Sequence, residues 1–115
     1  MTLESFSGIA YGPFEQKNVT ISDGSNELVA AVAGKRIGVY RFMLSGDSIV
    51  SYELRSGSNK IFTFYGNENF GVPLSAGSEQ IPIFKANIGE ALVLVASGAV
   101  NANVYLHYRL KHKGS

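Results

Sequence analysis

The stretch ALVLVASGAVNANVYLHYRL, residues 91–110, is the part of the sequence that most clearly decides the fold. It contains two apolar segments, 91–96 and 100–110, separated by a Ser97-Gly98 turn. In the second segment every other residue from Val100 to Tyr108 is apolar, and this period of two is typical of a strand with one buried face. The pattern predicts two antiparallel strands, and the turn between them favours pairing as a hairpin.

Strand signals of the same kind occur throughout the rest of the chain. Thirteen glycines, many beside Ser, Asn or Asp, divide it into short segments suited to strands and turns. The further predicted strands are residues 6–9, 17–22, 27–32, 36–44, 48–55, 61–65, 70–74 and 81–86. Pro73 and Pro82 cannot donate to a ladder, so we expect the last two strands at sheet edges or strand ends. Turns about every 8 to 12 residues predict an all-β, antiparallel β-sandwich, with a jelly roll as the preferred form.

The segment Arg36–Leu44 is expected to be a central strand, because both of its faces are apolar. Strict alternation divides its side chains into two sets, Ile37, Val39 and Met43 on one face and Tyr40, Phe42 and Leu44 on the other. Arg41 is the charged exception within this apolar segment.

Length and composition limit the functions that the chain can have. A chain of 115 residues suits one domain, residues 1–115, and without cysteine it can hold neither disulfides nor thiolate metal sites. Ten Lys and Arg against nine Asp and Glu give a net charge of +1 with no long run of one sign. Such a weak field does not favour nucleic-acid or anionic-lipid binding.

The sequence also predicts no export signal and no membrane segment. Met1–Ala10 lacks the basic start and apolar stretch of a secretory signal. The longest apolar runs, Leu28–Ala33 and Ala91–Ala96, are far shorter than the roughly 18 residues that cross a bilayer. The absence of cysteine suits a protein made in a reducing cytoplasm.

Catalytic and metal-binding motifs are not assembled in the sequence. His107 and His112 lack the ligand spacing of a zinc site, and Ala33-Gly34-Lys35-Arg36 fails the phosphate-loop pattern on both sides of its lysine. Asp23–Glu27 lacks the spacing of a calcium loop, and the serines occur in Ser-Gly turns that turn chemistry explains. We expect no enzymatic activity, no cofactor and no metal.

Five blocks of the chain resemble a small β-protein type found in tailed bacteriophages and prophages. The blocks are SNELVAAVAGKRI at 25–37, SGS at 56–58, GVPL at 71–74, GEALVL at 89–94 and SGAV at 97–100. The resemblance covers residues 25–108 and implies a virion structural protein, a capsid decoration or cement protein that is often a jelly-roll trimer. The chain departs from the type in its aromatic content between Phe62 and Phe84 and in the additional segment before Asn18.

The resemblance implies two kinds of partner: further copies of the chain, in a homotrimer, and the major capsid protein lattice on the virion surface. Arms and loops usually carry contacts, and we expect them in an N-terminal arm, Met1–Gln16, and in the loop before residue 71. The candidate contact residues are Phe6, Tyr11 and Phe14 in the arm and Asn67, Asn69 and Phe70 in the loop. The basic tail, Lys111–Ser115, is expected to fray.

The aromatic residues leave a second interpretation open. Aromatic side chains serve cores and subunit interfaces, and they also serve as platforms on which sugars stack. The set comprises Tyr40, Tyr52, Phe62, Phe64, Tyr65, Phe70, Phe84, Tyr105 and Tyr108. Core or subunit interface is the default, and the alternative function is a carbohydrate-binding module or fibre-tip receptor-binding domain that uses Tyr52 and Tyr65. Binding of single-stranded nucleic acid ranks below both, because it requires a basic groove.

Overall fold

The computed structural model describes residues 13–78 and 80–112, and every regular element in these ranges is a β-strand. The strands are β1 (Glu15–Ile21), β2 (Gly24–Val29), β3 (Lys35–Gly46), β4 (Ser51–Ser56), β5 (Asn59–Tyr65), β6 (Phe70–Ser75), β7 (Phe84–Lys85), β8 (Leu92–Ala96) and β9 (Ala102–His112). In the same ranges no helix has the length and apolar character needed to cross a membrane. The strand predicted at residues 6–9 lies outside the described residues.

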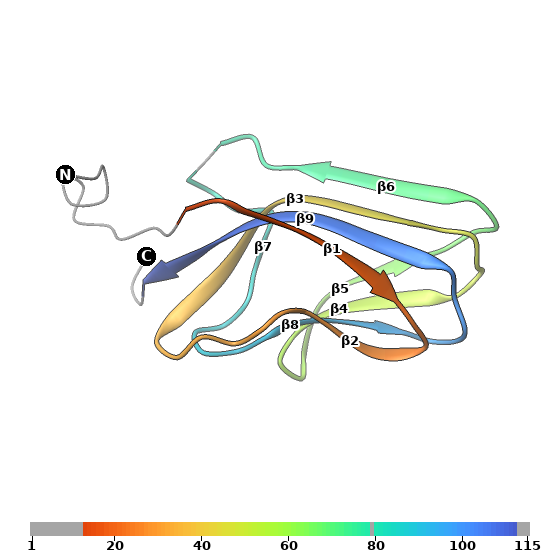
Figure 1. The fold of residues 1–115 in the computed structure, drawn as a ribbon, viewed down its shortest axis with the longest axis horizontal. Helices are drawn as coiled ribbons and strands as arrows, with labels where there is room; N and C mark the ends of the chain where they lie inside the picture. Colours follow the sequence, from red (N-terminus) through yellow and green to blue (C-terminus); the bar gives the residue numbers. More distant parts are fainter. Residues whose placement is uncertain (1–12, 79, 113–115) are drawn as a thin grey trace.

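The strands form two antiparallel sheets that pack face to face (Figure 1). The five-stranded sheet has the order β1-β9-β3-β6, with β7 also paired to β3, and the four-stranded sheet has the order β2-β8-β4-β5. The prediction of an all-β antiparallel sandwich is confirmed. Its edges include β6, which carries Pro73, so the prediction of an edge position for this proline is also confirmed.

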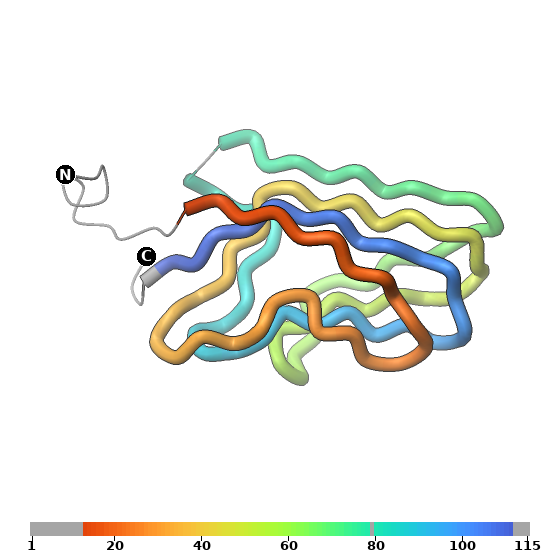
Figure 2. The backbone as a smooth tube through the Cα atoms, in the orientation of Figure 1, coloured from red at the N-terminus to blue at the C-terminus, as the bar shows by residue number. Residues whose placement is uncertain are grey.

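The connectivity is that of a jelly roll. Four antiparallel pairs are nested along the chain: β1 with β9, β2 with β8, β3 with β6, and β4 with β5. The chain therefore runs as one long hairpin that is rolled up into two sheets, as the tube in Figure 2 shows. The short strand β7 extends the pairing along β3 beyond β6.

The core lies between the two sheets and is filled by alternate residues from each strand. Tyr52 and Leu54 of β4 are fully buried, as the alternation of that segment predicts, while the residues between and beside them are half-buried. Phe42 of β3 stacks on Phe64 of β5, with 5.3 Å between ring centroids and 11° between ring planes, and so joins the sheets. The edge of Phe84 packs against both rings.

Strand β3 is central, as expected, but the predicted division of its faces is wrong. The pairing with β9 shifts register between Val39 and Arg41, which leaves Tyr40 as the additional residue of a β-bulge. The bulge places four side chains in the core: Ile37, Val39, Phe42 and Leu44. Arg41 and Met43 are exposed on the outer face. The additional residue reverses the inward and outward order of the side chains that follow it. Because apolar residues occur on both faces of this strand, the sequence does not reveal the reversal.

The predicted hairpin of residues 91–96 and 100–110 is also wrong. Strand β8 pairs with β2 and β4, whereas β9 pairs with β1 and β3, so the two strands belong to opposite sheets. The connection crosses the end of the sandwich, and the amide of Ser97 donates to the carbonyl of Ser51 in β4. Both strands bury one face against the same core, so their alternation is the same as in a hairpin.

Several predicted boundaries differ from the observed strands. Glu15 and Gln16, assigned to the arm, belong to β1 and pair with Tyr108 and His107. Lys111, assigned to a frayed tail, is 4% exposed in β9 and pairs with Arg36. The strand predicted at 27–32 ends at Val29, and Ala30–Ala33 form an exposed loop. The strand predicted at 81–86 is reduced to the two residues of β7, which begin beyond Pro82.

Candidate functional site

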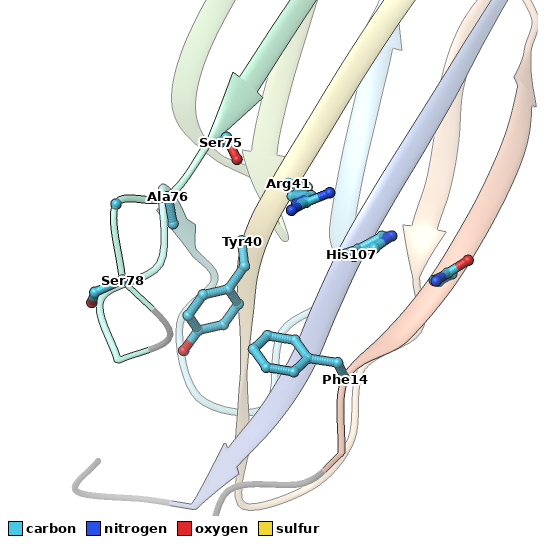
Figure 3. A pocket seen from close by; sticks show the side chains of 9 residues that line it. Phe14, Tyr40, Arg41, Ser75, Ala76, Ser78 and His107 are labelled. Carbon is cyan, nitrogen blue, oxygen red and sulfur yellow. The ribbon is translucent and has the colours of Figure 1, made fainter.

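A groove with a volume of about 440 Å³ lies on the outer face of the five-stranded sheet (Figure 3). Its lining residues are Phe14, Gln16, Tyr40, Arg41, Ser75, Ala76, Gly77, Ser78 and His107. A second depression of about 250 Å³ adjoins it and shares Arg41 and Ser75. Met43, Pro73 and Tyr105 line this second part.

Four polar side chains form a row across the middle of the groove. In the strand register Gln16 of β1 lies opposite His107 of β9, His107 lies opposite Arg41 of β3, and Arg41 lies opposite Ser75 of β6. Arg41 and His107 face outward, because Phe42 and Leu106 beside them point to the core, and their cross-strand partners Gln16 and Ser75 share that face. The row therefore takes one residue from each of the four long strands of this sheet.

Tyr105 holds one end of the row in place. Its hydroxyl donates a 3.0 Å hydrogen bond to Oε1 of Gln16 and lies 2.7 Å from Nε2 of His107. The Oε1 atom of Gln16 is therefore occupied, and the amide nitrogen of Gln16 remains as the donor at this end.

Phe14 forms an apolar wall of the groove. The Arg109 guanidinium carbon lies 4.0 Å from the centroid of the Phe14 ring, a cation–π arrangement. The Tyr40 ring meets the same ring edge-on, at 5.1 Å between centroids and 88° between planes. Tyr40 reaches this position because it is the bulge residue of β3. Figure 3 shows both rings at one end of the groove, below Arg41 and His107.

The loop between β6 and β7 bounds the groove on the side away from β1. Backbone bonds of 2.8 Å from the amide of Ala76 to the carbonyl of Tyr40, and of 2.7 Å from Ile83 to Val39, attach both ends of this loop to β3. Ser78 lies between these attachments and accepts hydrogen bonds from the backbone amide of Ile81 at 3.2 Å. Ala76, Gly77 and Ser78 therefore border the groove on this side.

The charged side chains at the outward strand positions of this sheet are positive. Its outward strand positions hold Arg36, Arg41, Lys85, Arg109 and Lys111. Within the described strands of the sheet, no Asp or Glu takes an outward position. Burial is the largest cause that lowers the pKa of Lys111, and the charges of three neighbours in this set, Lys85 first, lower it further. Five of the ten Lys and Arg residues of a chain with a net charge of +1 therefore lie on one face.

A second exposed surface lies at the end of the sandwich where β5 leads to β6. Tyr65 is 79% exposed and Ile49 is 73% exposed. Both flank the bond of 2.9 Å from the amide of Gly66 to the carbonyl of Val50. Asn67 and Asn69 are exposed in the loop that follows. We call the four residues Ile49, Tyr65, Asn67 and Asn69 the end surface.

The structure separates the predicted contact residues from one another. Phe6 and Tyr11 lie outside the described residues. Phe14 lines the groove, near the start of β1, whereas Asn67 and Asn69 belong to the loop between β5 and β6, and this loop lies at the opposite end of the sandwich (Figure 1). Phe70 is half-buried, and its ring packs on Tyr52 with 5.6 Å between centroids, so it contributes to the core.

Of the two tyrosines predicted to form a sugar-stacking platform, only one is accessible. Tyr52 is fully buried and cannot meet a ligand, whereas Tyr65 is exposed.

The sequence did not predict that Gln16, Arg41, Ser75 and His107 form a group. One signal was present, because Arg41 interrupts the apolar pattern of its strand.

The described residues contain no group of three or more His, Cys, Asp or Glu side chains that could hold a metal ion. No protein-family model matches the chain, and no curated protein is detectably similar to it.

Proposed function

We propose that this chain is a non-enzymatic virion structural protein, a capsid decoration or cement protein that binds a bacteriophage head and stabilises it. Its partners are further copies of itself, in a homotrimer, and the major capsid protein lattice. The jelly-roll connectivity supports this proposal because it recurs in viral capsid domains. The sequence blocks within residues 25–108 support it independently.

The observation that carries the proposal is the end surface. It combines a tyrosine and an isoleucine, each more than 70% exposed, with two asparagines on a short loop. Aromatic side chains surrounded by polar groups are typical of the residues that dominate binding energy at protein interfaces. A protein that binds only the assembled lattice raises the free energy needed to open that lattice, so binding alone gives the stabilising function.

The first test is the solution mass of the purified chain, measured by sedimentation velocity over a concentration series. A stable trimer is expected, and a strict monomer at every concentration would contradict the trimer.

The second test is co-sedimentation with expanded phage capsids. We expect Tyr65→Ser and Ile49→Ser to weaken capsid binding, while Ile81→Ser leaves it unchanged. Ile81 is a matched control because it is 72% exposed and lies in a different loop, between β6 and β7.

The groove favours a second candidate function, a carbohydrate-binding module or fibre-tip receptor-binding domain. Its size falls within the range of small-ligand sites, and it combines an aromatic wall with hydroxyl and amide groups. A glycan-binding screen tests this function. Saturable binding that is lost on Phe14→Ala and kept on Tyr65→Ala would assign it to the groove, whereas the reverse result would assign it to the end surface.

A further inference from the structure

We infer that the groove on the five-stranded sheet recognises an acidic saccharide, a sugar ring that carries a carboxylate, with Arg41 as the residue that binds the acid. This inference rests on the second candidate function and adds to it the charge of the ligand and the residue that selects it.

Arg41 has the position and the freedom that such a role requires. It lies between His107 and Ser75 in the row, and its side chain is exposed in the groove. Within residues 13–78 and 80–112, the ion pairs join Glu53 to Arg55 and Lys60, and none involves Arg41. A guanidinium presents a planar fork of donors that matches the two oxygens of a carboxylate. Its donors are therefore available to a bound acid.

The surroundings of Arg41 fit a sugar ring beside that acid. The amide nitrogen of Gln16 and the hydroxyls of Ser75 and Ser78 line the same groove and can bond to sugar hydroxyls. Phe14 supplies an apolar wall against which the carbon face of a sugar can pack. Contacts with Arg109 and Tyr40 fix this ring before any ligand arrives, which lowers the entropy cost of binding.

The charge of the face selects an acid over a neutral sugar. Five cations occupy its outward positions, without a carboxylate at the outward positions of the described strands. Their summed potential attracts an anion to the groove and increases its local concentration. A neutral sugar gains nothing from this potential.

The same observations disfavour a nucleic acid as the occupant. Single-stranded nucleic acids need a continuous charged track with several exposed aromatic rings. Here Lys111 is 4% exposed, Tyr40 is 4% exposed, and the guanidinium of Arg109 lies over the Phe14 ring. The loop that carries Ser78 also bounds the groove on one side. The site is therefore compact, as a short saccharide requires.

The experiment measures binding of short oligomers of galacturonic, glucuronic and sialic acid to the full chain by NMR titration. Each acid is compared with its neutral methyl ester, which keeps the ring and removes the charge. We expect at least one acid to bind about tenfold or more tightly than its ester, with shifts at Gln16, Arg41 and His107. Arg41→Gln should reduce acid binding to the level of the ester, and Arg41→Lys should retain part of it because the charge remains.

Lys60→Gln is the matched control, because it removes one positive charge from β5 in the opposite sheet, where the Lys60 side chain is 62% exposed. Its acid binding should equal that of the wild type.

Equal binding of acids and esters would overturn the inference while leaving the carbohydrate-binding function in place. Binding of no saccharide would overturn both. Tighter binding of a short single-stranded oligonucleotide would overturn the saccharide as ligand. Capsid binding is measured separately and is not affected by these results.

Discussion

The hydroxyl of Ser56, the last residue of β4, donates a 2.6 Å hydrogen bond to Oε1 of Glu90 in the loop before β8. It also accepts a 2.7 Å bond from the backbone amide of Asn87, whose side-chain amide donates to the same Glu90 oxygen at 3.0 Å. The amide of Gly57 donates to the carbonyl of Ala91 at 2.9 Å. These bonds attach the β4–β5 turn to the segment that enters β8.

Ser56→Ala is expected to destabilise the fold by about 1 to 3 kcal/mol, because Ser56 is 2% exposed and its loss leaves the Asn87 amide without this acceptor. Urea unfolding measures the change. Ser58→Ala, an exposed position two residues further in the same turn, is the control and should change the free energy of unfolding by less than about 0.5 kcal/mol. Equal effects at the two positions would contradict the role given to these bonds.

The same bonds predict how stability depends on pH. Hydrogen bonds from Ser56, and then from Asn87, lower the pKa of Glu90 below its usual value of 4.5. Because the folded state favours the ionised form, this contribution is present above pH 4.5 and is lost as the pH falls through the lower, folded pKa. Glu90→Gln should therefore flatten the loss of stability on acidification. Urea unfolding from pH 6 to pH 3 tests this, with the exposed Ser58→Ala, which leaves every carboxylate in place, as the control that should keep the wild-type slope.

The sequence predicts most of the strands and the sandwich because both depend on local alternation and on turn residues. It does not predict which strands pair. Strands β8 and β9 have the alternation of apolar and polar residues that a hairpin would have. The nested pairing of the jelly roll nevertheless places them in opposite sheets. Tyr40 shows the second limit, because one bulge residue changes the direction of every side chain that follows, and no local pattern marks the bulge.

The groove was less predictable than the fold. Its central row joins Gln16, His107, Arg41 and Ser75, which are distant in the sequence and meet only through the register of four strands. Phe14 was expected as a contact residue of an arm, whereas Asn67 and Asn69, expected as loop contacts, lie at the opposite end of the sandwich. A charged residue inside an apolar strand was the one available signal, and it pointed to Arg41.

Tyr52→Phe is expected to stabilise the protein by about 1 kcal/mol. The Tyr52 hydroxyl is buried in the core without a hydrogen-bond partner among the described residues, and burial, followed by the charge of Asp47, raises its pKa. The substitution removes the hydroxyl together with the free-energy cost of burying it, and it keeps the aromatic ring. Thermal and urea unfolding measure the change. Tyr105→Phe is the contrasting variant, because that hydroxyl bonds to Gln16 and His107, and it should lower stability slightly or leave it unchanged. A loss of stability in Tyr52→Phe would show that its hydroxyl has a partner.

Gly66→Ala is expected to destabilise the protein by about 1 to 3 kcal/mol through overpacking. A Cβ atom at this position would lie 2.5 Å from the backbone carbonyl oxygen of Ser48 and 3.0 Å from the rings of Tyr52 and Phe70, so the loop cannot accept it without moving. Gly71→Ala is the matched control, since a Cβ atom there meets nothing within 4 Å, and it should be neutral or slightly stabilising. Urea unfolding of both variants measures the difference. Because Gly66 lies between Tyr65 and Asn67, a stable Gly66→Ala variant would also show that close packing against Ser48, Tyr52 and Phe70 does not hold the loop of the end surface in place.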